Sequence, residues 1–271
     1  MYNAEFAGTI DLTLLIFLSF VLFFFGLIFY LRREDRREGY PLEDDVTGRL
    51  EGASGLFFTA QPKTFILPHG AGEVSKPDSG RDPVGIATAQ RTARVSGSPL
   101  EPVGDPLQAG VGPGSYVERA RRPDQTLHGE AKIVPLRTDP AYFIPRFDTD
   151  PRGMTVLGAD RVPAGVVSDV WVDRAEYLIR YIEVELTPLL GPGLTVVGSA
   201  PARRVLVPMT MAVIRKGRGV VSVDAVLAAQ LAGAPTLERS DQITFYEEER
   251  VCAYFGAGFL YATPMRAEPW L

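Results

Sequence analysis

The stretch that decides the fold is LTLLIFLSFVLFFFGLIFYL, residues 12–31. It contains no charged residue. With a rise of 1.5 Å per residue, a helix of about 20 residues spans about 30 Å, which is the thickness of the hydrocarbon core of a bilayer. Residues 12–31 therefore predict a transmembrane helix, and everything after them is expected to be tethered to a membrane.

The flanks of this stretch predict its orientation. Arg32, Arg33, Arg36 and Arg37 follow it closely, whereas residues 1–11 contain neither Lys nor Arg. Positively charged flanks tend to stay in the cytoplasm, so residues 1–11 are expected in the periplasm and the main domain in the cytoplasm. A cleaved signal peptide would need a basic start, a shorter apolar core and a small-residue cleavage site, so we interpret the helix as a retained anchor.

Composition limits the function classes. The 271 residues carry a formal net charge of −5, which argues against a nucleic-acid-binding protein because that function needs a clustered basic face. The single cysteine, Cys252, excludes an internal disulfide and fits a reducing cytoplasm. His69, His128 and Cys252 lie far apart in the sequence, so a structural zinc site is not expected.

The region from residue 32 to residue 115 is rich in proline and glycine after an initial charged run at residues 32–38. The charged run predicts a solvated extension of the helix, and the prolines and glycines exclude long regular elements. Apolar clusters at residues 56–58 and 65–67 are unusual for a free linker, which is the alternative interpretation. We expect residues 32–115 to be an extended segment, with a short strand at residues 63–67, that lies on partner subunits.

The compact domain is expected at residues 116–255 and to be mainly β. Several short β-branched runs separated by Gly and Pro predict a small barrel or sandwich. The expected strands cover residues 166–172, 177–186, 194–197, 205–208, 211–215 and 219–223. Two short helices are predicted: one capped by Asp224 and ending at residue 231, and one from Thr244, with Glu247 at capping-box spacing, to residue 255. Residues 256–271 are predicted to be a C-terminal tail.

No motif for catalysis stands out. The sequence contains no nucleophile elbow or phosphate-binding loop, and GVGPG at residues 110–114 lacks the context of a dinucleotide fingerprint. A concentration of charge does appear along the strands at residues 166–186: Asp169, Asp173, Arg174, Glu176, Arg180, Glu183 and Glu185. One interpretation is a solvated strand face with weak surface ion pairs. The other is a proton relay, in which partly desolvated carboxylates have raised, coupled pKa values.

A set of sequence blocks resembles the H subunit of the purple-bacterial photosynthetic reaction centre, over nearly the whole chain and in the same order. The blocks are RREDRREGYPLE after the apolar stretch, GVGPGSY at residues 110–116, HGEAKIVPL at 128–136, DVWVDRAEYLIRYIEVEL at 169–186, RVLVPM at 204–209 and EEERVCAYFGAGFLYATP at 247–264. The resemblance implies a PRC-type barrel in the cytoplasmic domain. It also implies a subunit without catalytic activity of its own, which caps and stabilises the L and M subunits.

The resemblance also implies where the cofactors and partners are. Bacteriochlorophyll, bacteriopheophytin, quinones and non-haem iron belong to the L and M subunits, and this chain by itself binds none of them. Further candidate partners are the light-harvesting antenna ring, a cytochrome subunit and membrane lipids, and nucleic acid is not among them. The implied location is the photosynthetic intracytoplasmic part of a bacterial inner membrane.

The same resemblance implies a role in the proton route to the secondary quinone. Carried over by motif, Glu176 is the acid nearest the quinone pocket, and Asp173 and Arg180 belong to the same polar cluster. His128 matches a histidine at the point of proton uptake.

Two departures from the family pattern affect the uptake point. Thr126 stands where related chains carry an acid, with Asp124 as a candidate replacement, and Glu130 stands where some carry a second histidine. A glutamate with an ordinary pKa near 4.3 is less suited to proton uptake at neutral pH than an imidazole near 6.5.

Two further function classes stay open at this point. One is a membrane-anchored PRC-barrel adaptor that binds a cytoplasmic protein or an RNA-processing partner, and the other is a tethered hydrolase. For the anchor itself, the small residues Ser19 and Gly26 predict the face on which another membrane helix can approach.

Overall fold

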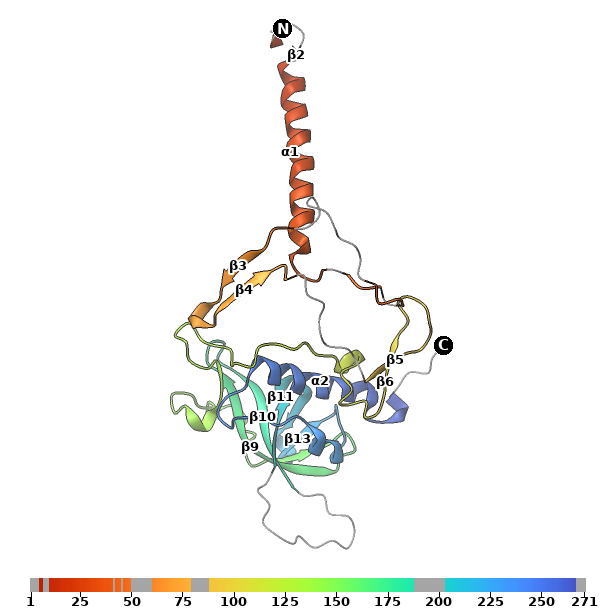
Figure 1. The fold of residues 1–271 in the computed structure, drawn as a ribbon. Coiled ribbons are helices and arrows are strands. Elements are labelled where there is room, and N and C mark those ends of the chain that lie inside the picture. The colour runs from red at the N-terminus through yellow and green to blue at the C-terminus, as the bar shows by residue number, and fades with distance from the viewer. Residues whose placement is uncertain are drawn as a thin grey trace. The chain divides into compact units, whose positions relative to one another are not determined.

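The computed structural model describes residues 5–6, 10–40, 42–44, 46–49, 60–78, 88–187 and 203–266. The chain divides into two compact units (Figure 1). Unit 1 comprises residues 1–85 and 93–98, and unit 2 comprises residues 86–92 and 99–271.

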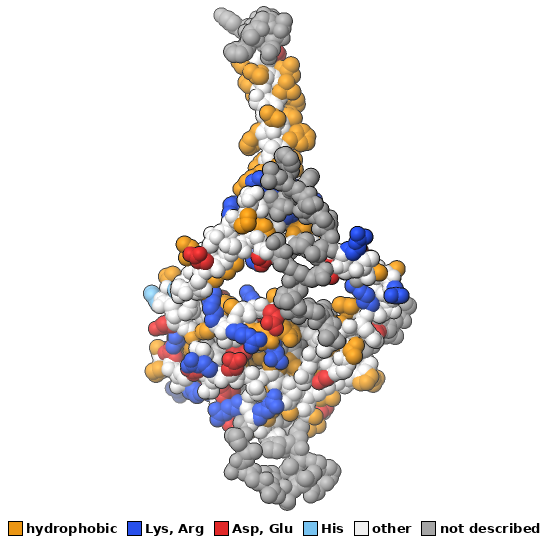
Figure 2. All heavy atoms as spheres, viewed as in Figure 1, with side chains coloured by type: hydrophobic (Ala, Val, Ile, Leu, Met, Phe, Trp, Pro, Cys, Tyr) orange, Lys and Arg blue, Asp and Glu red, His pale blue; other side chains and the backbone are white. Residues whose placement is uncertain are grey.

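Unit 1 contains the predicted membrane helix, α1 (Leu12–Glu34). Its first turn is capped by the Asp11 carboxylate, which accepts a hydrogen bond of 2.8 Å from the backbone N–H of Thr13. A 3-10 turn, η1 (Asp35–Arg37), extends α1 to 26 residues, long and apolar enough to cross a membrane. The predicted charged extension is therefore confirmed. The apolar side chains of α1 form the orange column of Figure 2.

Four short strands complete the described part of unit 1. β1 (Glu5–Phe6) pairs with β2 (Ile10–Asp11) just before α1. β3 (Lys63–Ile66) and β4 (Glu73–Lys76) form an antiparallel hairpin, which confirms the strand expected at residues 63–67. The apolar cluster at residues 56–58 lies outside the described residues.

Polar side chains at the end of α1 hold the base of the β3–β4 hairpin. The Arg37 guanidinium donates to the carbonyl oxygens of Gln61, at 2.6 Å, and of Lys76, at 3.0 Å. The Lys63 ammonium lies 3.1 Å from the Glu34 carboxylate. Arg37 and Glu34, at the end of the helix, thus fix where the base of the hairpin lies.

Unit 2 is built on a seven-stranded sheet with the order β11-β10-β9-β8-β13-β12, in which β7 also pairs with β9. All pairings are antiparallel except that between β8 and β13. The strands are β7 (Ile133–Pro135), β8 (Thr155–Leu157), β9 (Pro163–Asp173), β10 (Leu178–Leu186), β11 (Arg204–Pro208), β12 (Ala212–Arg215) and β13 (Val220–Val223). A separate antiparallel pair is β5 (Ala89–Arg91) with β6 (Leu100–Pro102).

The two edges of this sheet are consecutive in the chain. A 3-10 turn, η5 (Met209–Met211), joins β11 directly to β12, so the sheet curls until its edges approach each other at that corner. The pairings between described strands leave the sheet open along the rest of that edge. The mainly β domain is confirmed, while the strand expected at residues 194–197 lies outside the described residues.

The core of unit 2 fills the space between the curled sheet and helix α2 (Phe245–Tyr261), which lies against the strands in Figure 1. Trp171 of β9, Ile182 of β10 and Phe255 of α2 are fully buried in it. The capping box predicted for Thr244 and Glu247 is confirmed.

Helix α2 extends six residues beyond the predicted end at residue 255, so residues 256–261 of the expected tail are helical. The prediction ended the helix at glycine, but the glycines here serve close packing. A Cβ on Gly256 would lie 2.7 Å from the carbonyl oxygen of Pro113, and one on Gly258 would lie 2.6 Å from Cγ1 of Val226. The cost of glycine in a helix is offset by this approach of buried segments.

The helix predicted from Asp224 to residue 231 is wrong; the chain forms only a 3-10 turn, η7 (Ala229–Gly233). Carbonyl groups that such a helix needs are already engaged. Those of Asp224 and Ala225 accept from Arg266, at 2.8 and 2.7 Å, and that of Val226 accepts from the backbone of Ala159, at 2.9 Å. Tertiary hydrogen bonds therefore replace the local ones.

The compact domain also begins earlier than the predicted boundary at residue 116. Residues 99–115 belong to unit 2, and the side chains of Leu107 and Val111 are buried. Gly114 packs so closely on α2 that a Cβ would lie 2.8 Å from the Cβ of Ala257. The end of the proline- and glycine-rich segment is thus part of the domain's own packing, a contact that its composition did not indicate.

Replacing Gly258 by alanine tests this packing. Alanine is the better helix former, yet its methyl group would overlap Ala225 and Val226, so we expect a loss of about 1–3 kcal/mol in the free energy of unfolding. Gly217→Ala is the control, because a Cβ there meets nothing within 4 Å, and it should change stability by less than about 0.5 kcal/mol. Chemical denaturation of the full chain in detergent measures both; equal stabilities would contradict the packing argument.

Candidate functional site

The candidate site is built on the turn between β9 and β10. Asp173 ends β9, and its fully buried carboxylate accepts hydrogen bonds of 2.9 Å from the backbone N–H groups of Ala175 and Glu176. This is the Asx-type turn that aspartate favours. Tyr177 closes the turn with φ of +57°, an uncommon value for a residue other than glycine.

Two cations complete the inner cluster, which we define as Asp124, Lys132, Asp173, Glu176 and Arg180. Arg180 of β10 lies 3.1 Å from the Asp173 carboxylate and 3.0 Å from that of Glu176. The Lys132 ammonium lies 3.5–3.6 Å from all three carboxylates of the cluster. Four members of the cluster were predicted from the sequence. The fifth, Lys132, contacts all three carboxylates and was missed.

Strand register explains why Lys132 is there. β7 pairs with β9 so that Ile133 stands opposite Asp173, which places the preceding lysine beside the turn. The backbone N–H of Lys132 in turn donates to the carbonyl oxygen of Asp124 at 2.8 Å. Strand pairing thus brings together segments that lie about 40 residues apart. Neither segment by itself indicates that Lys132 and Asp173 will be neighbours.

The electrostatics of the inner cluster favour charged groups. Burial alone would raise the pKa of Asp173, but the two backbone donors, Arg180 and Lys132 outweigh it and hold that pKa below the ordinary value. Burial likewise acts to lower the pKa of Lys132, yet the surrounding carboxylates raise it. Asp173 therefore stays ionised at neutral pH.

Glu248 on α2 is a second residue that sequence interpretation missed. Its carboxylate accepts a hydrogen bond of 3.0 Å from the Tyr181 hydroxyl. Burial raises its pKa, the hydrogen bond from Tyr181 opposes this, and the charge of Asp124 raises it further. The sequence did carry a signal, because residues 247–249 are three consecutive glutamates. Consecutive side chains on a helix point in different directions, so at least one of the three is directed away from water.

A second group of charges lies further along β9 and β10. The carboxylates of Asp169 and Glu183 are buried, and Arg137 lies 3.1 and 2.9 Å from them. Glu183 also accepts from the indole N–H of Trp171 at 3.0 Å and from the Ser168 hydroxyl at 2.8 Å. These acids are therefore neither a solvated strand face nor part of the inner cluster.

The raised pKa values expected for the strand carboxylates are not found at Glu183 or Asp173. Burial acts to raise the pKa of Glu183, but Arg137, Trp171 and Ser168 lower it overall. The pKa values of Asp173 and Glu183 are thus lowered, and a raised pKa is found instead at Glu248, which lies on α2.

The predicted uptake residues occupy a tight hairpin before β7. Its ends are joined by the bridge between Gln125 and Ala131, and its tip exposes the His128 side chain. Glu130 is also exposed, and its carboxylate lies 3.3 Å from the Arg174 guanidinium. The structure therefore brings Asp124 into the inner cluster and leaves His128 and Glu130 at the surface.

The inner cluster joins a half-exposed acid to a buried one through two shared cations. The Glu176 side chain is 49% exposed, whereas that of Asp173 is 0% exposed, and both contact Lys132 and Arg180. Among the described residues, no group of His, Cys, Asp and Glu is arranged to hold a metal ion. The chemistry available here is charge stabilisation and proton exchange.

Comparison with known protein families finds two matches. Residues 4–138 match the family model described as photosynthetic reaction centre, H-chain N-terminal region. Residues 146–230 match the PRC-barrel domain. The first match covers α1, the β3–β4 hairpin and the hairpin that carries His128, and the second covers most of the curled sheet.

Replacing Asp173 by asparagine tests the electrostatics of the cluster. Because its folded-state pKa is lowered, Asp173 contributes stability that is present above its unfolded pKa, near 3.8, and is lost as the pH falls through the folded pKa. Asp173→Asn should therefore cost roughly 2 kcal/mol at pH 7 and much less near pH 3. Urea unfolding followed by tryptophan fluorescence at both pH values measures this; a cost independent of pH would contradict it.

Proposed function

Because this chain belongs to the H-chain family of the photosynthetic reaction centre, we propose that it caps the L and M subunits on the cytoplasmic side and carries part of the proton route to the secondary quinone. Membership of the family makes it a non-catalytic subunit that associates with other reaction-centre subunits. The cofactors of the reaction, namely bacteriochlorophyll, bacteriopheophytin, quinones and non-haem iron, would be held by the partners.

The observation that carries the proton-route proposal is the inner cluster. A proton route through protein needs ionisable groups that remain hydrated at one end and continue into the interior. Glu176 is half-exposed, Asp173 is fully buried, and Lys132 and Arg180 bridge them. We assign Glu176 as the group that hands protons to the partner, with Asp124 and the exposed His128 and Glu130 on the uptake side.

Glu248 extends the proposed route. A raised pKa brings a carboxyl group closer to the pH at which it can both bind and release a proton. Asp173, whose pKa is lowered, is better suited to stabilise positive charge nearby than to carry a proton itself. The proposed roles therefore differ: Glu176 of the inner cluster and Glu248 of α2 exchange protons, and Asp173 remains an anion that stabilises positive charge beside it.

The β3–β4 hairpin supports the capping role. Its two strands expose apolar side chains: Phe65 is 47% exposed, Ile66 is 82% exposed and Val74 is 37% exposed. A two-stranded hairpin alone is marginally stable in water, so these side chains favour burial against another protein. We assign that surface to the membrane-embedded partners, because Arg37 ties the hairpin to the end of α1.

The family and the apolar helix together fit a membrane-anchored subunit. We propose that α1 crosses the photosynthetic inner membrane with its N-terminus in the periplasm, and that Arg32, Arg33 and Arg36 lie at the cytoplasmic headgroups. The face with Ser19 and Gly26 would contact a neighbouring membrane helix, since a Cβ on Gly26 meets nothing within 4 Å of its own chain.

The first experiment identifies the partners. The full chain, tagged and purified from mild detergent extracts of its native membrane, should bring down a coloured assembly whose absorption bands are those of bacteriochlorophyll and bacteriopheophytin. A colourless assembly would contradict the proposal and favour a PRC-barrel adaptor for another cytoplasmic protein. The tagged chain extracted from a pigment-free host is the control for non-specific binding.

The second experiment tests Glu176. In the intact complex, Glu176→Gln should slow proton-coupled reduction of the secondary quinone by about tenfold in flash measurements, since a positioned acid or base commonly contributes at least that much. Glu185→Gln is the matched control. Its side chain, 41% exposed and 3.1 Å from Arg204, is also a half-exposed glutamate on an arginine, but it lies outside the inner cluster.

The outcomes of this experiment are distinct. Equal rates for wild type and Glu176→Gln, in complexes with unchanged pigment spectra, would remove Glu176 from the route. Equal slowing by Glu176→Gln and Glu185→Gln would assign the effect to the general loss of negative charge.

A further inference from the structure

A short basic segment is held rigidly beside the start of α2. Residues 119–122 read RARR in a chain whose net charge is −5. The carbonyl oxygens of Arg122 and Ala120 accept hydrogen bonds of 3.1 and 3.3 Å from the first backbone N–H groups of α2, those of Phe245 and Tyr246. The bridge between Pro123 and Thr244 continues this contact, so the arginines project from a backbone that is fixed in place.

The guanidinium groups of this segment stack on aromatic rings of α2. The Arg119 and Arg122 guanidinium carbons lie 5.0 and 5.4 Å from the centre of the Phe245 ring. That of Arg121 lies 4.3 Å from the centre of the Tyr246 ring. We define the arginine–aromatic surface as Tyr116, Arg119, Arg121, Arg122, Phe245, Tyr246 and Arg250.

The remaining members extend the surface along α2. Arg250 lies on the same helix one turn after Tyr246, with its guanidinium carbon 5.7 Å from the centre of that ring. Tyr116 packs on Tyr246 edge to face, with 6.1 Å between ring centres. One arginine of the four, Arg119, forms an ion pair with Glu249 at 3.2 Å.

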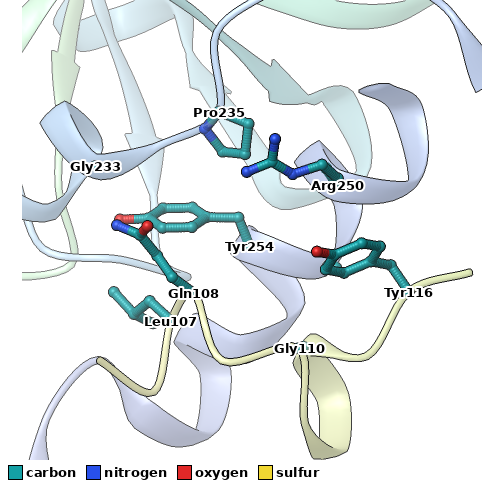
Figure 3. A pocket seen from close by; sticks show the side chains of 10 residues that line it. Leu107, Gln108, Gly110, Tyr116, Gly233, Pro235, Arg250 and Tyr254 are labelled. Carbon is teal, nitrogen blue, oxygen red and sulfur yellow. The ribbon is translucent and has the colours of Figure 1, made fainter. Parts of the chain in front are cut away.

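A small, open pocket adjoins this surface (Figure 3). In Figure 3 the Arg250 side chain reaches over the space between Pro235 and Tyr116, with the ring of Tyr254 and the amide of Gln108 across from it. The residues that line the pocket include neither Asp nor Glu. It offers the Arg250 guanidinium and the Gln108 amide to a ligand that brings negative charge, whereas the Tyr254 hydroxyl already donates to the carbonyl oxygen of Gln230 at 2.6 Å.

We propose that the arginine–aromatic surface docks a carboxylate-bearing segment of a partner reaction-centre subunit, with one of its acidic side chains entering the Arg250 pocket. Arginine and tyrosine are enriched at the centres of protein interfaces. Guanidinium groups already stacked on rings lose less conformational freedom on binding and pair bidentately with carboxylates. The proposal rests on the proposed function, since it supplies a second contact through which the chain caps its partners.

The first test measures affinity. The full chain in neutral detergent is titrated into the pigmented partner core from which this subunit has been removed. Arg121→Gln/Arg122→Gln should weaken binding about tenfold at low salt, a loss of about 1.4 kcal/mol, and the difference should shrink as salt screens the charges. Lys216→Gln/Arg218→Gln is the matched control, because it removes the same charge from the exposed β12–β13 turn.

The second test locates the partner's carboxylates. In Arg121→Lys/Arg122→Lys the charge is kept and amines are introduced, so a zero-length carbodiimide should link residues 121 and 122 to aspartates or glutamates of a partner subunit. The native amine of Lys216 should form no such link. Mass spectrometry of the linked peptides then identifies the docking segment.

Each result separates this proposal from the proposed function. If the wild-type chain does not bind the pigmented core, the proposed function itself fails. If it binds and the glutamine variant binds equally well, only the docking surface is overturned. Cross-links solely to Glu249 of this chain would also overturn it. A glutamine variant that binds normally but whose purified complex contains less phospholipid phosphorus would overturn it as well and would identify a lipid site.

Discussion

The carboxylate of Asp173 is the group on which the arrangement of the domain depends most. A fully buried charge is costly unless its hydrogen bonds are satisfied, and here satisfaction requires the turn backbone, Arg180 of the next strand and Lys132 from a distant segment. Asp173 therefore stabilises the conformation of the turn, the position of Arg180 and the position of the segment before β7, which carries Lys132. The same contacts place a half-exposed acid, Glu176, at the surface beside it.

Close approach between α2 and the rest of unit 2 is the second constraint. Gly114, Gly256 and Gly258 allow the backbones of three segments to meet where side chains would collide. That packing carries the start of α2 to residues 119–122 and so assembles the arginines and aromatic rings on one surface. The glycines thus allow the helix position, and the arginine–aromatic surface follows from it.

Charge is distributed between the two regions in opposite senses. The inner cluster has three carboxylates to two cations, whereas the arginine–aromatic surface has four arginines, of which Arg119 pairs with Glu249. A chain with a modest net charge of −5 therefore presents an acidic site and a basic surface on the same unit. Such segregation orients a partner more strongly than net charge can.

Sequence alone determined the elements whose causes are local. The uncharged run at residues 12–31, the β-branched runs of β9 and β10 and the capping box at Thr244 each act through neighbouring residues, and the predicted helix, strands and cap are present. The resemblance to the H-chain family likewise rested on ordered blocks of sequence. Asp173, Glu176 and Arg180 form one cluster because all three lie within eight residues at the β9–β10 turn and the start of β10.

Only the tertiary structure decided what depends on distant segments meeting. Lys132 and Glu248 join the site through strand register and helix packing, and Asp224 fails to start a helix because Arg266 and Ala159 occupy the carbonyl groups of that segment. Glycine at residue 256 indicated the end of a helix, yet close packing against Pro113 kept it helical. Local preferences are worth about 1 kcal/mol per residue, and burial and buried hydrogen bonds outweigh them wherever they disagree.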